Sequence, residues 1–170
     1  MPGDVGVPGD LVALAEELQR ACLERGLTVA VAESCTGGLV AAAITAVPGS
    51  SGYFLGGVVS YSNEAKVAFL GVPDGLLAAH GAVSPEVAGT MAAGARARFG
   101  ADLAVGVTGV AGPDGGTADK PVGLVHLGIA RDGEVGTIEQ RFDGDRAAIR
   151  EAAAFRALAL LHAYAMQAAP

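Results

Sequence analysis

Three short polar stretches contain the side chains of this sequence that could do chemistry. The first, at residues 33–36, reads Glu-Ser-Cys-Thr and follows an apolar run. The second, at residues 61–66, reads Tyr-Ser-Asn-Glu-Ala-Lys, and the third, at residues 109–120, is glycine-rich and ends in a lysine. Hydroxyl and amine groups serve as nucleophiles and proton carriers. Because each stretch follows an expected strand, we expect the three to share one cleft.

The 11 basic side chains include only two lysines, Lys66 and Lys120, and both lie in polar segments beside turn residues. A lysine can lose its proton when it is removed from water, whereas an arginine cannot, so a lysine can act as a base. The alternative for Lys66 is a solvated position on a helix. For Tyr61 the alternative is a half-buried aromatic side chain in a strand.

Ser34 stands where a strand at residues 27–31 is expected to pass through a turn into a helix. Ligands bind at the carboxyl ends of strands in open α/β sheets, and the N-terminus of the next helix offers amide groups to an anion. The arrangement is similar to a nucleophile elbow, but the G-x-S-x-G spacing is absent. Ser34 or Thr36 could instead only cap the helix that follows Gly37 and Gly38.

The elements that must position these groups follow from the apolar periodicity. Their order predicts an α/β fold, a three-layer α/β/α sandwich around a mixed, mostly parallel five-stranded sheet. The Asp132-Gly133 turn makes the last two strands antiparallel. Residues 1–8 are expected to be a flexible start, and residues 9–168 a single domain. The other strands are expected at 57–61, 102–108, 122–130 and 135–142, and the helices at 10–25, 39–47, 73–79, 84–99, after residue 62 and after residue 145.

Side chains suited to N-caps mark the starts of four of these helices: Asp10, Ser62, Ser84 and Asp145. Arg146 and Arg150 lie near the start of the last helix, where an arginine opposes the helix dipole. A phosphate or carboxylate partner is one reason for such a placement.

Charge and composition exclude several classes of function. The net charge is −7 and the sequence pI is about 4.8, which argues against a protein that binds nucleic acid. No apolar run is long enough for a membrane span and the first residues do not resemble a signal peptide, so we expect a cytoplasmic protein.

The two cysteines form no metal-ligand pattern, and no metal site is expected. Cys35 is a rival nucleophile, but a continuing strand would point it away from Ser34.

Six segments match one protein family in order and spacing: residues 32–38, 61–66, 80–84, 108–116, 120–123 and 144–146. Together they closely resemble the CinA C-terminal domain family, which includes the stand-alone nicotinamide mononucleotide deamidase PncC. The resemblance covers about residues 10–165. It implies a fold like the anticodon-binding domains of tRNA synthetases. It also implies an amidohydrolase of NAD salvage that converts nicotinamide mononucleotide and water into nicotinic acid mononucleotide and ammonia, without metal or cofactor.

The resemblance also implies roles for individual residues. Amide hydrolysis needs a nucleophile, a proton carrier and donors facing the oxyanion. We assign Ser34 as nucleophile, Lys66 as base and Tyr61 as proton relay or positioning group. Residues expected to contact the substrate or its phosphate are Thr36, Gly37, Gly38, Asn63, Thr108, Gly109, Gly112, Lys120 and Arg146.

Two other functions stay open. The chain could be a non-enzymatic nucleotide-binding or regulatory module linked to competence or DNA damage, or a different amidase or esterase with the same pair of residues. The apolar, alanine-rich helices also lead us to expect a homodimer.

Overall fold

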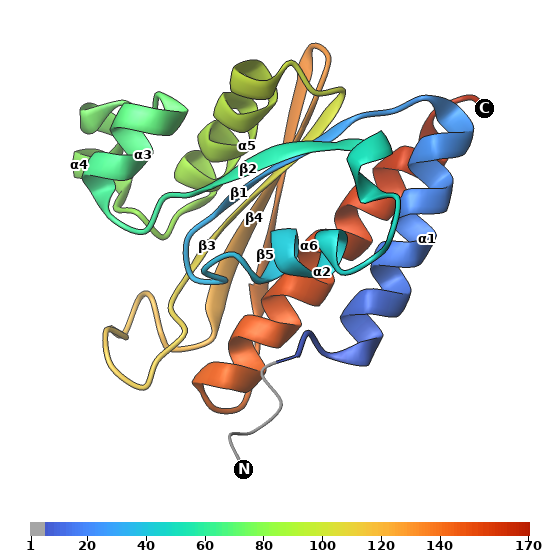
Figure 1. Ribbon diagram of the computed structural model, residues 1–170. Coiled ribbons are helices and arrows are strands. Elements are labelled where there is room, and N and C mark those ends of the chain that lie inside the picture. Colours follow the sequence, from blue (N-terminus) through green and yellow to red (C-terminus); the bar gives the residue numbers. More distant parts are fainter. Residues whose placement is uncertain (1–5) are drawn as a thin grey trace.

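A five-stranded sheet forms the middle layer of the protein (Figure 1). The structure is a computed structural model, and it describes residues 6–170. The strand order is β2-β1-β3-β4-β5, with β1, β2 and β3 parallel and β4 antiparallel to both of its neighbours. The strands are β1 (Val29–Glu33), β2 (Phe54–Val59), β3 (Leu103–Gly109), β4 (Leu124–Arg131) and β5 (Glu134–Arg141).

The predicted α/β fold and mixed sheet are confirmed, with one refinement. The pairings of β1 with β2 and of β1 with β3 are parallel, so only two of the four strand pairings are parallel. The reason is the segment at residues 110–123, which contains no helix and returns the chain directly beside β3. A parallel neighbour would need a crossover connection instead.

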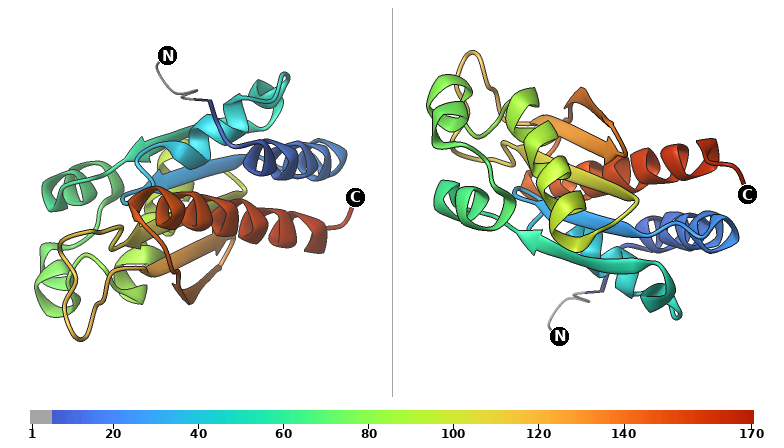
Figure 2. Two further views of the ribbon diagram at one scale, coloured as in Figure 1. Left: turned by 90° about the horizontal axis from the view of Figure 1, so that it is seen from below. Right: turned by 90° about the horizontal axis from the view of Figure 1, so that it is seen from above.

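Helices cover both faces of the sheet (Figure 2). α1, α2 and α6 pack on one face, and α5 lies on the other with α3 and α4 beside it. The helices are α1 (Gly9–Arg25), α2 (Leu39–Thr45), α3 (Asn63–Leu70), α4 (Asp74–His80), α5 (Pro85–Phe99) and α6 (Arg146–Gln167), with a short 3₁₀ helix at Ser50–Gly52. All six predicted helices therefore form.

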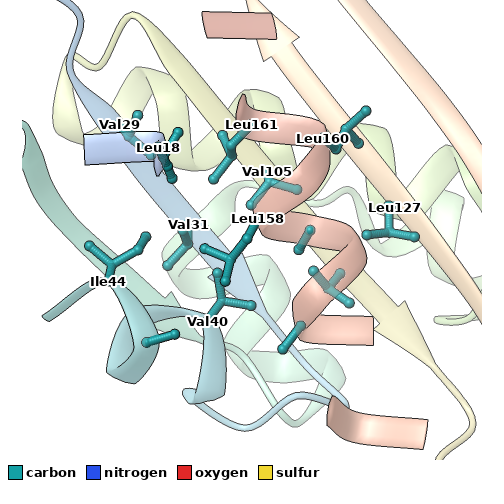
Figure 3. Packing of buried hydrophobic residues seen from close by; sticks show 14 of the residues in the cluster. Leu18, Val29, Val31, Val40, Ile44, Val105, Leu127, Leu158, Leu160 and Leu161 are labelled. Atoms are coloured by element: carbon teal, nitrogen blue, oxygen red, sulfur yellow. The ribbon is translucent and has the colours of Figure 1, made fainter. Parts of the chain in front are cut away.

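The central strand β1 is buried on both faces, and its side chains alternate between two cores. Val29 and Val31 belong to the core beneath α1, α2 and α6, whereas Ala30 and Ala32 belong to the core beneath α5. Figure 3 shows the two valines among leucines of α1 and α6. The same alternation decides to which side the residues after the strand point.

The carboxyl end of β1 lies at a topological switch point. From β1 the chain passes through α2, on one face of the sheet, to β2 on one side of β1. From β2 it crosses the opposite face through α3, α4 and α5 to β3 on the other side of β1. Crevices that bind ligands form at such points in open α/β sheets, and Ser34 directly follows β1.

Three of the four predicted N-caps are confirmed. Side-chain oxygens of Ser62, Ser84 and Asp145 accept hydrogen bonds from amides in the first turns of α3, α5 and α6. The prediction for Asp10 is wrong, because α1 begins at Gly9 after Pro8 and has no side-chain cap. Pro8 occupies the N-cap position, and its carbonyl accepts the first hydrogen bonds of the helix, from the amides of Leu11 and Val12. The predicted flexible start at residues 1–8 lies mostly outside the described residues.

Candidate active site

A hollow of about 310 Å³ opens at the carboxyl ends of β1 and β3. Its walls come from the turn after β1, from the start of α3, from the segment after β3 and from the first residue of α6. Seven of the twelve predicted site residues line it: Ser34, Tyr61, Lys66, Thr108, Gly109, Gly112 and Arg146. The other five, Thr36, Gly37, Gly38, Asn63 and Lys120, do not.

Lys66 and Ser34 are in contact inside this hollow. The Nζ atom of Lys66 lies 3.0 Å from Oγ of Ser34, and it donates hydrogen bonds to the carbonyl oxygens of Ser60, at 2.7 Å, and Tyr61, at 3.4 Å. The Lys66 side chain is 1% exposed. The alternative of a solvated helix position is therefore excluded.

Burial lowers the pKa of Lys66, because removal from water disfavours the charged ammonium. No carboxylate among the described residues forms an ion pair with Lys66. The neighbours of Nζ are a hydroxyl and two carbonyls, all uncharged. This environment favours the neutral amine, the form that can accept a proton.

Cys35 is a poor rival to Ser34. The side chain of Ser34 lies on the face of the sheet that α3 occupies, as the alternation along β1 requires. Cys35 belongs to the core on the opposite face, beneath α1, α2 and α6. Burial raises the pKa of the Cys35 thiol to about 12, and the protonated thiol is a weak nucleophile.

Glu33 caps α2, a role that the sequence analysis missed. Its carboxylate is 1% exposed and accepts hydrogen bonds from the amides of Val40, at 2.9 Å, and Ala41, at 3.1 Å. Gly38 occupies the N-cap position without a side-chain bond, so neither Ser34 nor Thr36 caps this helix. The available signal was a carboxylate at the end of an apolar strand before a helix that lacks an acidic residue in its first turn.

The carboxylate of Glu33 also changes where a substrate anion could bind. The sequence predicts free amide groups at the start of α2. In the structure the anion in that place is Glu33 itself, and the amide of Leu39 bonds to the carbonyl of Thr36. Thr36 is fully buried. The geometry therefore gives no support to the predicted substrate contacts of Thr36, Gly37 and Gly38.

Arg150, in the second turn of α6, donates hydrogen bonds to the backbone of the segment between β1 and α2. Its Nε donates to the carbonyl of Cys35 at 3.2 Å, and its Nη2 donates to the carbonyl of Thr36 at 3.0 Å. A side chain at Gly37 would lie 3.2 Å from Nη2, so the glycine leaves room for this contact. The partners of this arginine are backbone carbonyls within the turn.

The side chain of Arg146 lies along one wall of the hollow and connects two segments of it. Its Nη1 donates to the carbonyl of Gly112 at 2.7 Å, and its Nη2 donates to the hydroxyl of Tyr61 at 2.9 Å. Its two partners are uncharged, in contrast to the expected anion. Tyr61 is 61% exposed, so it is not a half-buried strand residue. The Tyr61 hydroxyl bonds to Arg146 and not to Ser34 or Lys66, which gives no support to a proton relay.

Thr108 and Gly109, two further predicted site residues, line the hollow at the end of β3 and are fixed there by close contacts with neighbouring segments. The hydroxyl of Thr108 donates to the carbonyl of Ala82 at 2.8 Å and ties the end of β3 to the segment before α5. A side chain at Gly109 would lie 2.7 Å from Val125, so β4 packs too closely for any residue but glycine.

Lys120 and Asn63 lie outside the hollow. Nζ of Lys120 donates to the carbonyl of His80, the last residue of α4, and so fastens the glycine-rich segment to that helix. The negative end of the helix dipole favours a cation there. Asn63 is the first residue of α3 and is exposed.

The described part of the chain has neither a metal-ligand cluster nor a membrane-spanning helix. Residues 6–170 contain no group of three or more histidine, cysteine, aspartate or glutamate side chains that could hold a metal ion. Within the same range, every helix is too short or too polar to cross a bilayer.

One protein family matches nearly the whole of the described chain. The sequence model of one family, described as the CinA C-terminal domain, matches residues 11–165. The CinA-like protein of Geobacter sp. strain M21 is 58% identical over 141 residues, which are 83% of this chain and 34% of that protein. The CinA-like protein of Geobacter sulfurreducens is 53% identical over 156 residues, which are 92% of this chain and 38% of that protein. The chain thus spans about a third of the length of these curated relatives.

Solved structures agree with the fold. The crystal structure of the competence/damage inducible protein CihA from Agrobacterium tumefaciens superposes with a TM-score of 0.88 at 49% identity and covers 92% of this chain and 96% of that chain. The crystal structure of the competence-damaged protein (CinA) superfamily protein from Enterobacter cloacae gives 0.87 at 32% identity, covering 91% and 92%.

Proposed function

The chain belongs to the CinA C-terminal domain family, and we propose that it is an amidohydrolase that converts nicotinamide mononucleotide (NMN) and water into nicotinic acid mononucleotide and ammonia. The observation that carries the proposal is the buried contact between Nζ of Lys66 and Oγ of Ser34. Burying a lysine without a carboxylate is costly, and a module that only binds a nucleotide has no need of it.

The contacts of Lys66 suit a general base. The neutral amine has two N–H groups, which the carbonyls of Ser60 and Tyr61 accept. Its lone pair is then left for the hydroxyl proton of Ser34, 3.0 Å away. Ser34 attacks the carboxamide carbon while its proton passes to Lys66. The protonated Lys66 then gives that proton to the departing ammonia. Water attacks the resulting ester by the same route and releases the acid.

The substrate phosphate is assigned to Arg146. Lys66 and Arg146 are the two basic side chains that line the hollow, and Arg146 is exposed and bonded only to uncharged partners. A guanidinium has five donors, so it can keep the bond to Gly112 while it binds a phosphate. In this proposal Tyr61 holds Arg146 in place, and the pyridine ring lies between Arg146 and Ser34.

Ammonia release from NMN by the purified chain tests the proposal, with Ser34→Ala measured beside it. Ser51→Ala is the matched control, because Ser51 is an exposed serine in the 3₁₀ helix and does not line the hollow. We expect release by the wild type and by Ser51→Ala, and none by Ser34→Ala. Nicotinamide riboside, which lacks the phosphate, should be a poorer substrate through a higher KM.

The other expectations about partners stay predictions. If the folded wild type releases no ammonia, the hollow is better explained as a nucleotide-binding or regulatory site without chemistry. The homodimer needs a more specific reason than the alanine content of α6, because four of the nine alanines of this helix are buried within the chain. A better reason is the edge strand β2, where Leu55 and Val59 are exposed and no side chain is charged. Light scattering that shows only monomer would reject the dimer.

A further inference from the structure

Arg150 lies behind the turn that carries Ser34, and we propose that it is a positioning residue for the oxyanion of the reaction. The inference rests on the proposed amide hydrolysis. It assigns to Arg150 the task of orienting and polarising the backbone amide of Cys35, which would donate to the substrate oxygen.

A chain of hydrogen-bonded peptide groups connects Arg150 to that amide. Nη2 of Arg150 donates to the carbonyl of Thr36 at 3.0 Å. The N–H on the far side of that peptide belongs to Gly37 and donates to the carbonyl of Ser34 at 3.0 Å. The N–H on the far side of that second peptide belongs to Cys35. The carbonyl and the N–H of a trans peptide point in opposite directions, so the peptide dipoles run in series from the guanidinium.

The amide of Cys35 is the amide of this turn best placed for a substrate, because Cys35 lines the hollow and Gly38 does not. The amide of Ser34 bonds to the carbonyl of Val107, and that of Gly37 is taken as described above. Thr36 is fully buried, whereas Cys35 lines the hollow. Within residues 6–170 the N–H of Cys35 has no backbone acceptor, and its one neighbour is the sulfur of its own side chain, a weak acceptor that a substrate oxygen can replace.

This arrangement suits the step in which negative charge develops. When Oγ of Ser34 forms its bond to the carboxamide carbon, the π electrons of the C=O bond move to the oxygen and the proton of Ser34 passes to Lys66. The residue after a nucleophile commonly supplies an oxyanion donor. A donor is strengthened when the carbonyl of its own peptide accepts a hydrogen bond, and a guanidinium at the end of the chain adds a full charge.

The second contact of Arg150 keeps the turn from rotating. Nε donates to the carbonyl of Cys35 at 3.2 Å, so one planar guanidinium holds two successive carbonyls. A lysine has one nitrogen and cannot reproduce both contacts. The charge of Arg150 is permanent, so its effect should not depend on pH.

Kinetics of Arg150→Met and Arg150→Lys with NMN test this role, with Arg156→Met as the control. Arg156 lies farther along α6 and does not line the hollow. We expect Arg150→Met to lower kcat about 10-fold to 100-fold, less than the loss of a direct donor, with KM and the pH midpoint unchanged. Arg150→Lys should fall between it and the wild type, and Arg156→Met should match the wild type.

A second readout separates this inference from the proposed function. A fluorophosphonate probe forms a tetrahedral adduct on an activated serine and so needs the same oxyanion donor. The wild type should be labelled at Ser34, and Arg150→Met more slowly by the same factor as kcat. A folded Arg150→Met with wild-type kcat and labelling rate overturns the inference alone. If that variant does not fold, wild-type rates for Arg150→Lys overturn it. A wild type that neither hydrolyses NMN nor reacts with the probe overturns the proposed function and this inference together.

Discussion

Replacing Glu33 by glutamine should destabilise the protein strongly, although the change removes only one charge. The carboxylate accepts bonds from the amides of Val40, at 2.9 Å, and Ala41, at 3.1 Å, in a place closed to water. Glutamine keeps one acceptor oxygen, and its NH₂ group would face the second amide. That amide would then be buried without a partner, since Gly38 offers no side chain at the N-cap.

The expected loss follows from these contacts. A hydrogen bond to a charged group contributes about 1.5–3 kcal/mol, and an unsatisfied buried donor costs about 1–3 kcal/mol. The neutral glutamine is easier to bury, which offsets part of the loss, so we expect about 2–4 kcal/mol. For a domain of this size that corresponds to a fall in Tm of about 4–16 °C.

Thermal unfolding followed by circular dichroism measures the effect, with Glu64→Gln as the control. Glu64 is also an acid in the first turn of a helix, α3, but it is exposed. Its loss should cost less than about 1 kcal/mol. Equal Tm values for the Glu33→Gln protein and the wild type would refute the reasoning, as would equal shifts in the two variants.

Four other predictions concern the hollow. Activity should rise with pH and reach its midpoint below 10.5, the ordinary lysine value, because burial lowers the pKa of Lys66; a pH–rate profile with a higher midpoint would contradict this. Lys66→Met should abolish activity yet raise Tm, since the folded wild type bears the cost of a buried ammonium. That gain should be largest below the lowered pKa and shrink as the pH rises toward 10.5, which calorimetry at neutral and alkaline pH can test. Cys35→Ala should keep nearly full kcat, because the thiol has a pKa of about 12; a large loss would return Cys35 to the candidates. Arg146→Met should raise KM for NMN about 10-fold or more and leave KM for nicotinamide riboside unchanged.

The sequence was sufficient for the fold because most of its local signals agree. Helix periodicity, the N-caps Ser62, Ser84 and Asp145, and the apolar strands all indicate the same elements. The prediction of a mostly parallel sheet was only partly right, because β4 pairs with β3 in the antiparallel direction. No local signal in residues 110–123 indicates which strand the next one will pair with. That choice depends on long-range packing.

The site was predictable where chemistry and element ends coincide. Ser34 and Lys66 each stand near the carboxyl end of a strand, and the structure brings them together. The roles of Glu33 and Arg150 were not predictable, because both act through backbone groups of a turn whose peptide orientations leave no trace in residue type. Lys120 was assigned to the substrate by its charge, whereas it fastens two backbone segments.

Conversion of NMN to nicotinic acid mononucleotide by the wild type, Ser34→Ala and Lys66→Arg in one assay tests the central claim most directly. Arginine keeps the positive charge but cannot accept the proton of Ser34. We predict turnover by the wild type and a loss of about 1,000-fold or more in both variants, with both shown to be folded. Turnover by Lys66→Arg at the wild-type rate would contradict the account, since Lys66 could then not be the base.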